Sequence, residues 1–183
     1  MQKTVSYDLK LATALLTDVA KTLAGAAWFS DNGWQYSVHN FPPPPAAPES
    51  VTLHVFKPHW YNRQHQGIHF ETFLSAQQWR DGEMPVMLHI LHTPVIPGTT
   101  LKRIKLSTPF VDSCYDMVSE WPGYSFRTGK YGTQPFSCRI KFDLDNPDKS
   151  KSALEKEFTR LCKKLGPLMD SSLAEVLASA KAK

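Results

Sequence analysis

Three histidines and one glutamate fall on three consecutive segments whose composition predicts β-strands. The segments are 51–56, 67–73 and 85–92, and apolar side chains recur in each at every second position. The polar residues are His54, His69, Glu71 and His89. Successive side chains of a strand point to opposite faces, so all four are out of phase with the apolar residues that would face a core. If the strands pair as a meander, three imidazoles and a carboxylate share one face of the sheet.

That face is compatible with two kinds of chemistry. Phe56 and Phe73 share it, and aromatic area mixed with a few polar groups is typical of the floor of a binding pocket. Our leading interpretation is a binding or interaction protein that takes a small molecule or a protein on this face and needs no cofactor. The alternative is a metal-dependent enzyme, because two or three imidazoles and a carboxylate can hold a divalent transition metal such as zinc or iron. Its metal ligands would be His54, His69, Glu71 and His89.

A second alternative, a nucleic-acid-binding domain, rests on four basic residues. They fall opposite the apolar positions of two further predicted strands, 101–106 and 131–144. The four are Arg103, Lys105, Arg139 and Lys141. A basic sheet face with interleaved aromatic residues can follow a phosphate backbone. The chain has neither a ribonucleoprotein signature nor zinc-finger spacing, so we favour a solvated face over a nucleic-acid partner.

Composition narrows the class of protein. The formal net charge is +4, the apolar fraction is 42%, and no apolar run approaches the roughly 18 residues that would cross a bilayer. The N-terminus has no apolar signal region, so we expect a soluble cytoplasmic protein without a membrane partner. The three cysteines lack CxxC spacing, and the chain contains no P-loop, no GxGxxG and no HExxH motif. Whether the protein is an enzyme therefore stays open at this point.

The order of predicted elements indicates a single α+β domain over residues 1–183. Its sheet is expected to be mainly antiparallel with about five to seven strands. The expected helices are an N-terminal one over 6–24, an inserted one that begins near Pro109, and two C-terminal ones divided at Gly166–Pro167. Asn32-Gly33 predicts a hairpin over 28–38, and the proline-rich segment 41–48 predicts an extended internal loop.

Overall fold

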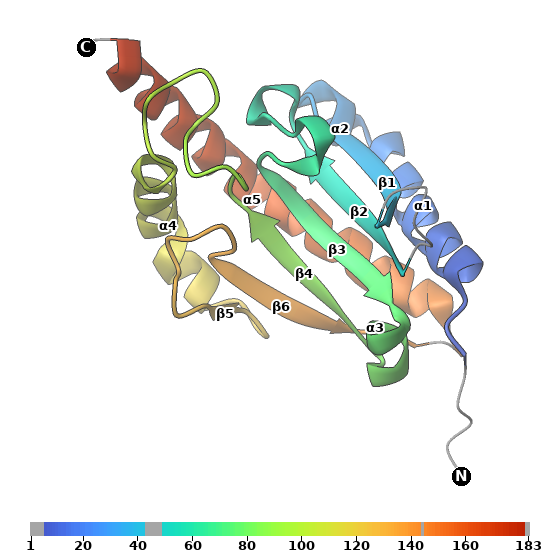
Figure 1. The fold of residues 1–183 in the computed structure, drawn as a ribbon. Helices are drawn as coiled ribbons and strands as arrows, with labels where there is room; N and C mark the ends of the chain where they lie inside the picture. The colour runs from blue at the N-terminus through green and yellow to red at the C-terminus, as the bar shows by residue number, and fades with distance from the viewer. Residues whose placement is uncertain (1–5, 43–48, 144, 182–183) are drawn as a thin grey trace.

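A six-stranded antiparallel sheet is the centre of the fold in the computed structural model, which describes residues 6–42, 49–143 and 145–181 (Figure 1). The strands are β1 (Gln35–Phe41), β2 (Ser50–Phe56), β3 (His69–Ser75), β4 (Glu83–His89), β5 (Ser125–Phe126) and β6 (Phe136–Lys141). Their order across the sheet is β1-β2-β3-β4-β6-β5, and every neighbouring pair is antiparallel. The α+β class with an antiparallel sheet is thereby confirmed.

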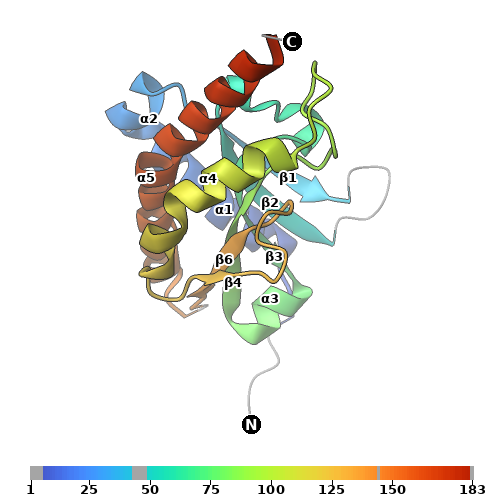
Figure 2. The same cartoon turned by 90° about the vertical axis from the view of Figure 1, so that its left-hand side faces the viewer.

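Helices form a layer against one face of this sheet. The α-helices are α1 (Leu9–Gly25), α2 (Ala27–Asp31), α3 (Ala76–Asp81), α4 (Ile104–Ser119) and α5 (Pro147–Lys181), and two short 3₁₀ helices are η1 (Pro58–Trp60) and η2 (Arg63–His65). In both views of the ribbon, α1, α4 and α5 lie on the same side of the sheet (Figures 1 and 2). Among the described residues, no helix combines the length and the apolar character needed to cross a membrane.

The core lies between this helix layer and the sheet. Asp8 caps α1 by accepting a hydrogen bond from the backbone N–H of Leu11 at 3.0 Å, and the helix buries its apolar stripe. On β2 the alternate residues Val51, Leu53 and Val55 are fully buried in the same core. The side chains between them on β2 therefore point to the face of the sheet that the helix layer does not cover.

The C-terminal region differs from the expected pair of helices. A single helix, α5, runs from Pro147 to Lys181 with Pro167 inside it. The buried residues of its two halves continue one stripe at spacings of three and four: Leu154, Phe158, Leu161, Leu165, Met169, Leu173 and Val176. Because one continuous helix buries both halves against the same core, the free energy gained by burial outweighs the local cost of the proline.

Two further expectations are wrong. Residues 27–31 form α2 instead of the first arm of a hairpin, and Gly33, at φ +70°, provides the left-handed turn that leads into β1. β1 then pairs with β2. The predicted strand 101–106 is also absent, because α4 begins at Ile104 and buries Leu106 in the core. The proline-rich segment joins β1 to β2, and its residues 43–48 lie outside the described residues.

Candidate functional site

The strand register brings the four polar residues singled out from the sequence onto one face. His54 of β2 pairs with Glu71 of β3, and His69 of β3 pairs with His89 of β4. Directly paired residues of antiparallel strands project from the same face, and so do residues two apart on one strand. All four side chains therefore lie on the face opposite the helix layer, as alternation predicts.

Glu71 is the centre of this arrangement. Its Oε2 atom lies 3.6 Å from Nε2 of His54, 3.3 Å from Nε2 of His69 and 3.0 Å from Nε2 of His89. The histidine side chains are between 0% and 7% exposed, and that of Glu71 is 14% exposed. One carboxylate oxygen is thus surrounded by three buried imidazole nitrogens.

Three more histidines complete the group, and the sequence did not single them out. His39 lies on β1, His65 on η2, and His92 just beyond β4. The ring of His39 stacks on that of His65 with centroids 3.6 Å apart. We call His39, His54, His65, His69, His89, His92 and Glu71 the histidine cluster; it holds all but one of the seven histidines of the chain.

Left-handed backbone conformations occur at or beside His65 and His92, the two histidines of the cluster that lie outside the strands. Gln64 and His65 have φ values of +53° and +62°, and Leu91, directly before His92, has +49°. Such a conformation costs an L-residue roughly 1–3 kcal/mol, and residues that adopt it are enriched at functional sites. The backbone N–H of His92 donates to the carbonyl of Gln66 at 2.9 Å, so the two loops are tied to each other.

A neighbouring glycine makes this loop crossing feasible. A Cβ atom on Gly67 would lie 2.2 Å from the backbone carbon of Tyr61. The N–H of Gly67 donates to the side chain of Asn62 at 3.2 Å, and the N–H of Ile68 donates to the carbonyl of Trp60 at 2.8 Å. Only glycine permits this close return of the chain.

Five imidazoles of the cluster have a lowered pKa, which favours the neutral form: His39, His65, His69, His89 and His92. Burial lowers the pKa of His69 to about 3, although its hydrogen bond to Glu71 acts in the opposite direction. Burial, reinforced by unfavourable electrostatic interactions with His54 and His65, lowers the pKa of His39 to about 4. Burial also lowers the pKa of His89 to about 4. Neutral imidazole is the form that binds a metal ion.

Glu71 is held in the ionised form. Burial opposes its charge, but hydrogen bonds from His54 and His69 and the nearby His89 outweigh burial and hold the pKa of the carboxyl well below its usual range. His39, His69 and His89 therefore offer neutral nitrogens beside an anionic oxygen at neutral pH, which is the protonation state of a set of metal ligands.

The cluster opens onto a hollow of about 360 Å³. Phe41, Ser50, Thr52, Gln66 and Phe73 complete its lining. Phe73 thus lies beside the cluster as expected, whereas Phe56 is not part of the lining and packs against the core. The hollow gives small molecules and ions a route to the buried ring nitrogens.

The geometry fits metal coordination. In a tetrahedral site with metal–ligand bonds of about 2.0–2.1 Å, ligand atoms lie about 3.3–3.4 Å from one another. The separations of 3.0–3.6 Å around Glu71 Oε2 bracket that value. Three groups of residues could each hold an ion, with ligand atoms within 4.8 Å of one another: His39, His54 and His65; His69, His89 and His92; and His54, His69 and Glu71.

The four basic residues do not come from two neighbouring strands. Arg139 and Lys141 lie on β6, but Arg103 directly precedes α4 and Lys105 lies in its first turn. Arg103 donates to the carbonyl of Leu91 at 3.1 Å, and Arg139 forms an ion pair with Glu83 at 3.3 Å. The prediction that Arg103 and Lys105 lie on a strand is therefore wrong, whereas Arg139 and Lys141 do lie on one.

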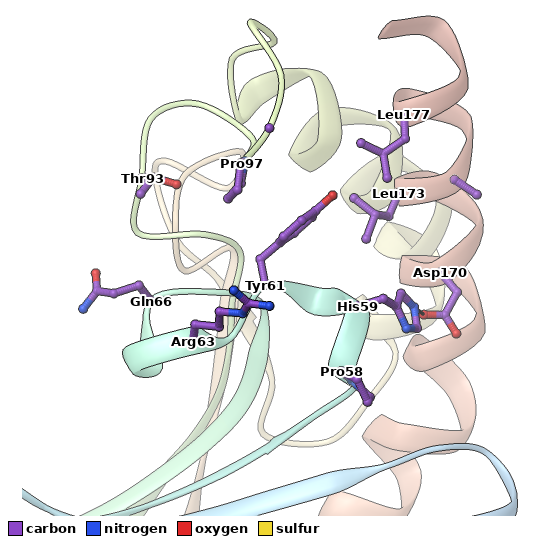
Figure 3. A pocket seen from close by; sticks show the side chains of 12 residues that line it. Pro58, His59, Tyr61, Arg63, Gln66, Thr93, Pro97, Asp170, Leu173 and Leu177 are labelled. Atoms are coloured by element: carbon purple, nitrogen blue, oxygen red, sulfur yellow. Dashed lines mark hydrogen bonds and ion pairs between the residues drawn. The ribbon is translucent and has the colours of Figure 1, made fainter. Parts of the chain in front are cut away.

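A larger hollow of about 930 Å³ lies between η1, η2 and the C-terminal half of α5 (Figure 3). Tyr61 projects into it toward Leu173 and Leu177, and Arg63 lies on the η2 side (Figure 3). Gln66 lines both this hollow and the one beside the histidine cluster. The turn at 63–66 thus forms a common wall between the two, and the larger hollow has the size and the mixed lining of a small-molecule site.

Asp170 anchors one end of the larger hollow. Its Oδ1 accepts a hydrogen bond from the Trp60 indole at 2.7 Å and lies 2.8 Å from Nε2 of His59, the histidine outside the cluster. Its Oδ2 forms an ion pair with the buried Lys57. Asp170 therefore fixes η1 to α5.

Comparison of the chain with protein-family models, with curated proteins and with solved structures gives no match. Functional inference consequently rests on the geometry of the histidine cluster.

Proposed function

We propose that this protein binds a transition metal ion through the histidine cluster. The observation that carries the proposal is the position of Glu71 Oε2, within 3.0–3.6 Å of the Nε2 atoms of His54, His69 and His89. Imidazole nitrogen combined with one carboxylate suits zinc, copper, iron and nickel, and does not suit calcium or magnesium, which prefer oxygen ligands.

Burial favours a metal ion over a protein partner as the occupant. His69 is fully buried and His54 is 4% exposed, so neither presents its ring at the molecular surface. A protein docked on this face would contact the rim of the hollow but not these nitrogens. A metal ion reaches buried ligand atoms because it is small and strips off its water as the ligands replace it.

The protonation states support the same proposal. An ordinary histidine with a pKa near 6.5 is partly protonated at mildly acidic pH, and a proton competes with the metal for the ring nitrogen. Burial lowers the pKa of His69 to about 3 and that of His89 to about 4. These rings do not need to lose a proton before they bind an ion at neutral pH.

Elemental analysis and calorimetry test the proposal. Protein purified without a histidine tag and stripped with a chelator should bind Zn²⁺ when titrated, with heat that is absent for a variant in which His54, His69 and His89 are all replaced by Ala. His59→Ala is the matched control, because His59 is 55% exposed on its side chain and lies outside the cluster. If neither Zn²⁺, Cu²⁺ nor Ni²⁺ binds at micromolar concentration, the proposal fails.

The enzyme alternative uses the same residues and remains a prediction. The hollow of about 360 Å³ leaves room beside the ligands for water or a small substrate. A metal ion with an open coordination position activates bound water, which is the usual basis of metal-dependent hydrolysis. We place metal binding first, because it requires only the atoms described above.

A further inference from the structure

We infer that the histidine cluster holds two transition metal ions, one on each side of Glu71. This inference rests on the proposed metal-binding function and adds the number of ions and the residues that hold each one. The first ion lies among His39, His54 and His65, which we call the first triad; the second lies among His69, His89 and His92, the second triad.

The number of donor groups is the first argument. Six imidazoles and one carboxylate are gathered in one place, and a single transition ion in a protein takes about four to six ligands. The two triads share no residue, and in each triad the three ligand atoms lie within 4.8 Å of one another. Three imidazoles per ion leave one position for Glu71 or for water, which completes the four ligands of a tetrahedral site.

The position of Glu71 is the second argument. Its Oε2 atom lies 3.6 Å from the first triad at His54, and 3.3 Å and 3.0 Å from the second triad at His69 and His89. A carboxylate in this position places its negative charge between the two ions and reduces their mutual repulsion. Paired metal ions about 3.5–4 Å apart are a recurrent arrangement in proteins.

Unpaired nitrogens in the histidine cluster are the third argument. The Nδ1 atoms of His39, His54 and His65 in the first triad, and that of His69 in the second, are buried, and none has a hydrogen-bond partner in the described part of the chain. Buried polar atoms in native proteins are almost always paired, so four unpaired nitrogens in one cluster point to an absent binding partner. The second triad has its own internal contact, 2.9 Å between Nδ1 of His89 and Nε2 of His92.

Both triads are built in the same way, which is the fourth argument. Each takes two histidines from a pair of neighbouring strands and one from a loop with left-handed backbone. In the first triad that residue is His65, at φ +62°, and in the second it is His92, which follows Leu91 at φ +49°. Strained backbone persists only where the surrounding structure enforces it, and here it brings a third imidazole to each side.

The chemical class of the ions follows from the ligands. A set of imidazoles with one carboxylate favours copper or zinc over manganese, calcium and magnesium. The probes for the test are therefore Zn²⁺ for counting sites and Cu²⁺ for measuring whether the sites are adjacent.

The test is the metal content of four proteins at saturation, with circular dichroism as a check of folding. Wild type and the His59→Ala control should each bind about two Zn²⁺ per chain. A double variant, His39→Ala with His65→Ala, should bind about one, and so should His92→Ala with His89→Ala. The ion retained by each double variant also shows that its site is still folded.

Electron paramagnetic resonance supplies an independent readout with Cu²⁺. Two neighbouring Cu²⁺ ions couple, so wild type loaded with copper should give a signal that is well below the copper content or split by the interaction. Each double variant should give the full signal of one isolated Cu²⁺.

The outcomes separate this inference from the proposed function. If wild type saturates at about one ion, and both double variants lose that same ion, the two-ion inference is wrong while metal binding stands. A folded double variant that binds no ion contradicts independent triads and also overturns the inference. If no protein of the set binds metal, both proposals fail.

Discussion

Glu71 is the residue on which the cluster depends most, because it supplies the anionic oxygen that three imidazole nitrogens share. Its histidine neighbours are buried and carry no negative charge, so the carboxylate is the main negative charge available to an incoming cation. Asp170 is a second carboxylate with several side-chain partners. It contacts Lys57, His59 and Trp60 on the other side of the 63–66 turn.

Replacement of Glu71 by Gln keeps the size of the side chain and removes its charge. Loss of a residue that only orients a ligand lowers metal affinity by about 10- to 100-fold, so loss of a direct ligand should raise the dissociation constant for Zn²⁺ by about 100-fold or more. Competition with a chromogenic chelator measures the change. An unchanged dissociation constant would mean that Glu71 does not contact the ion.

Replacement of Asp170 by Asn should destabilise the protein at neutral pH. It removes the counter-charge of Lys57, which is 9% exposed. Loss of one partner of a fully buried pair costs about 3–5 kcal/mol, and the partial exposure of Asp170 reduces our expectation to about 1–2 kcal/mol. Urea unfolding at pH 7 measures the difference, and Asp148→Asn, at the exposed start of α5, is the control.

The effect of that replacement should depend on pH. Although burial opposes its charge, hydrogen bonds from Lys57, Trp60 and His59 lower the pKa of Asp170 below 3.8 in the folded protein. A carboxyl with a lowered pKa contributes stability that is complete above the unfolded value and is lost as pH falls through the folded value. The gap between wild type and Asp170→Asn should therefore shrink as pH is lowered below about 4. A gap that is constant between pH 7 and pH 3 would contradict this role.

At the scale of elements, α5 does the most to hold the sheet in place. Its stripe packs in the core with α1 and α4, and its C-terminal half forms one wall of the larger hollow. The helix also runs through Gly166 and Pro167 without ending, so close packing on its buried side matters more there than local helix propensity.

Replacement of Gly166 by Ala separates packing from propensity. A Cβ atom at this position would lie 2.5 Å from Cζ2 of the buried Trp34. Propensity alone would stabilise the helix by about 1 kcal/mol, but overpacking costs about 1–3 kcal/mol, so we expect a net loss of about 0.5–2 kcal/mol. Gly25→Ala is the control, because nothing lies within 4 Å of its Cβ position. If Gly166→Ala is the more stable of the two variants in urea, Trp34 moves freely and the packing argument is wrong.

Removal of a large side chain from the stripe of α5 should be costly. Phe158 and Leu161 are fully buried, and replacing either by Ala should lower the free energy of unfolding by about 2 to 5 kcal/mol. Lys164, exposed on the same helix, is the control position. A loss below about 0.5 kcal/mol would show that the helix packs through another face.

At the scale of the whole molecule, metal binding and folding should be coupled. The ligands come from β1 to β4 and the loops at 63–66 and 90–92, so they meet only in the folded chain. An ion that binds the folded state alone stabilises it by about 2.7 kcal/mol when its concentration is 100 times the dissociation constant.

Thermal unfolding in the presence of Zn²⁺ measures this coupling. We expect the midpoint to rise with Zn²⁺ concentration and to return to its starting value when a chelator is added. His59→Ala should show the same rise. A midpoint that does not depend on Zn²⁺, in a protein that calorimetry shows to bind it, would mean that the unfolded chain binds the ion equally well.

Local patterns in the sequence determined which residues face the core and which face away. The two-residue period of a strand is set by its backbone, so the shared face of His54, His69, Glu71 and His89 follows from alternation before any pairing is known. The same holds for the buried stripes of α1 and α5, because the helical period is equally local.

The tertiary structure alone decided how many imidazoles meet. His39 joins the cluster through the register of β1 on β2, and His65 and His92 join it through two loops whose path depends on contacts between distant segments. The continuity of α5 past Pro167 and the start of α4 within the predicted strand 101–106 were likewise decided by burial against the core. Register, loop path and burial are set by contacts between residues far apart in the chain, and local periodicity carries no information about them.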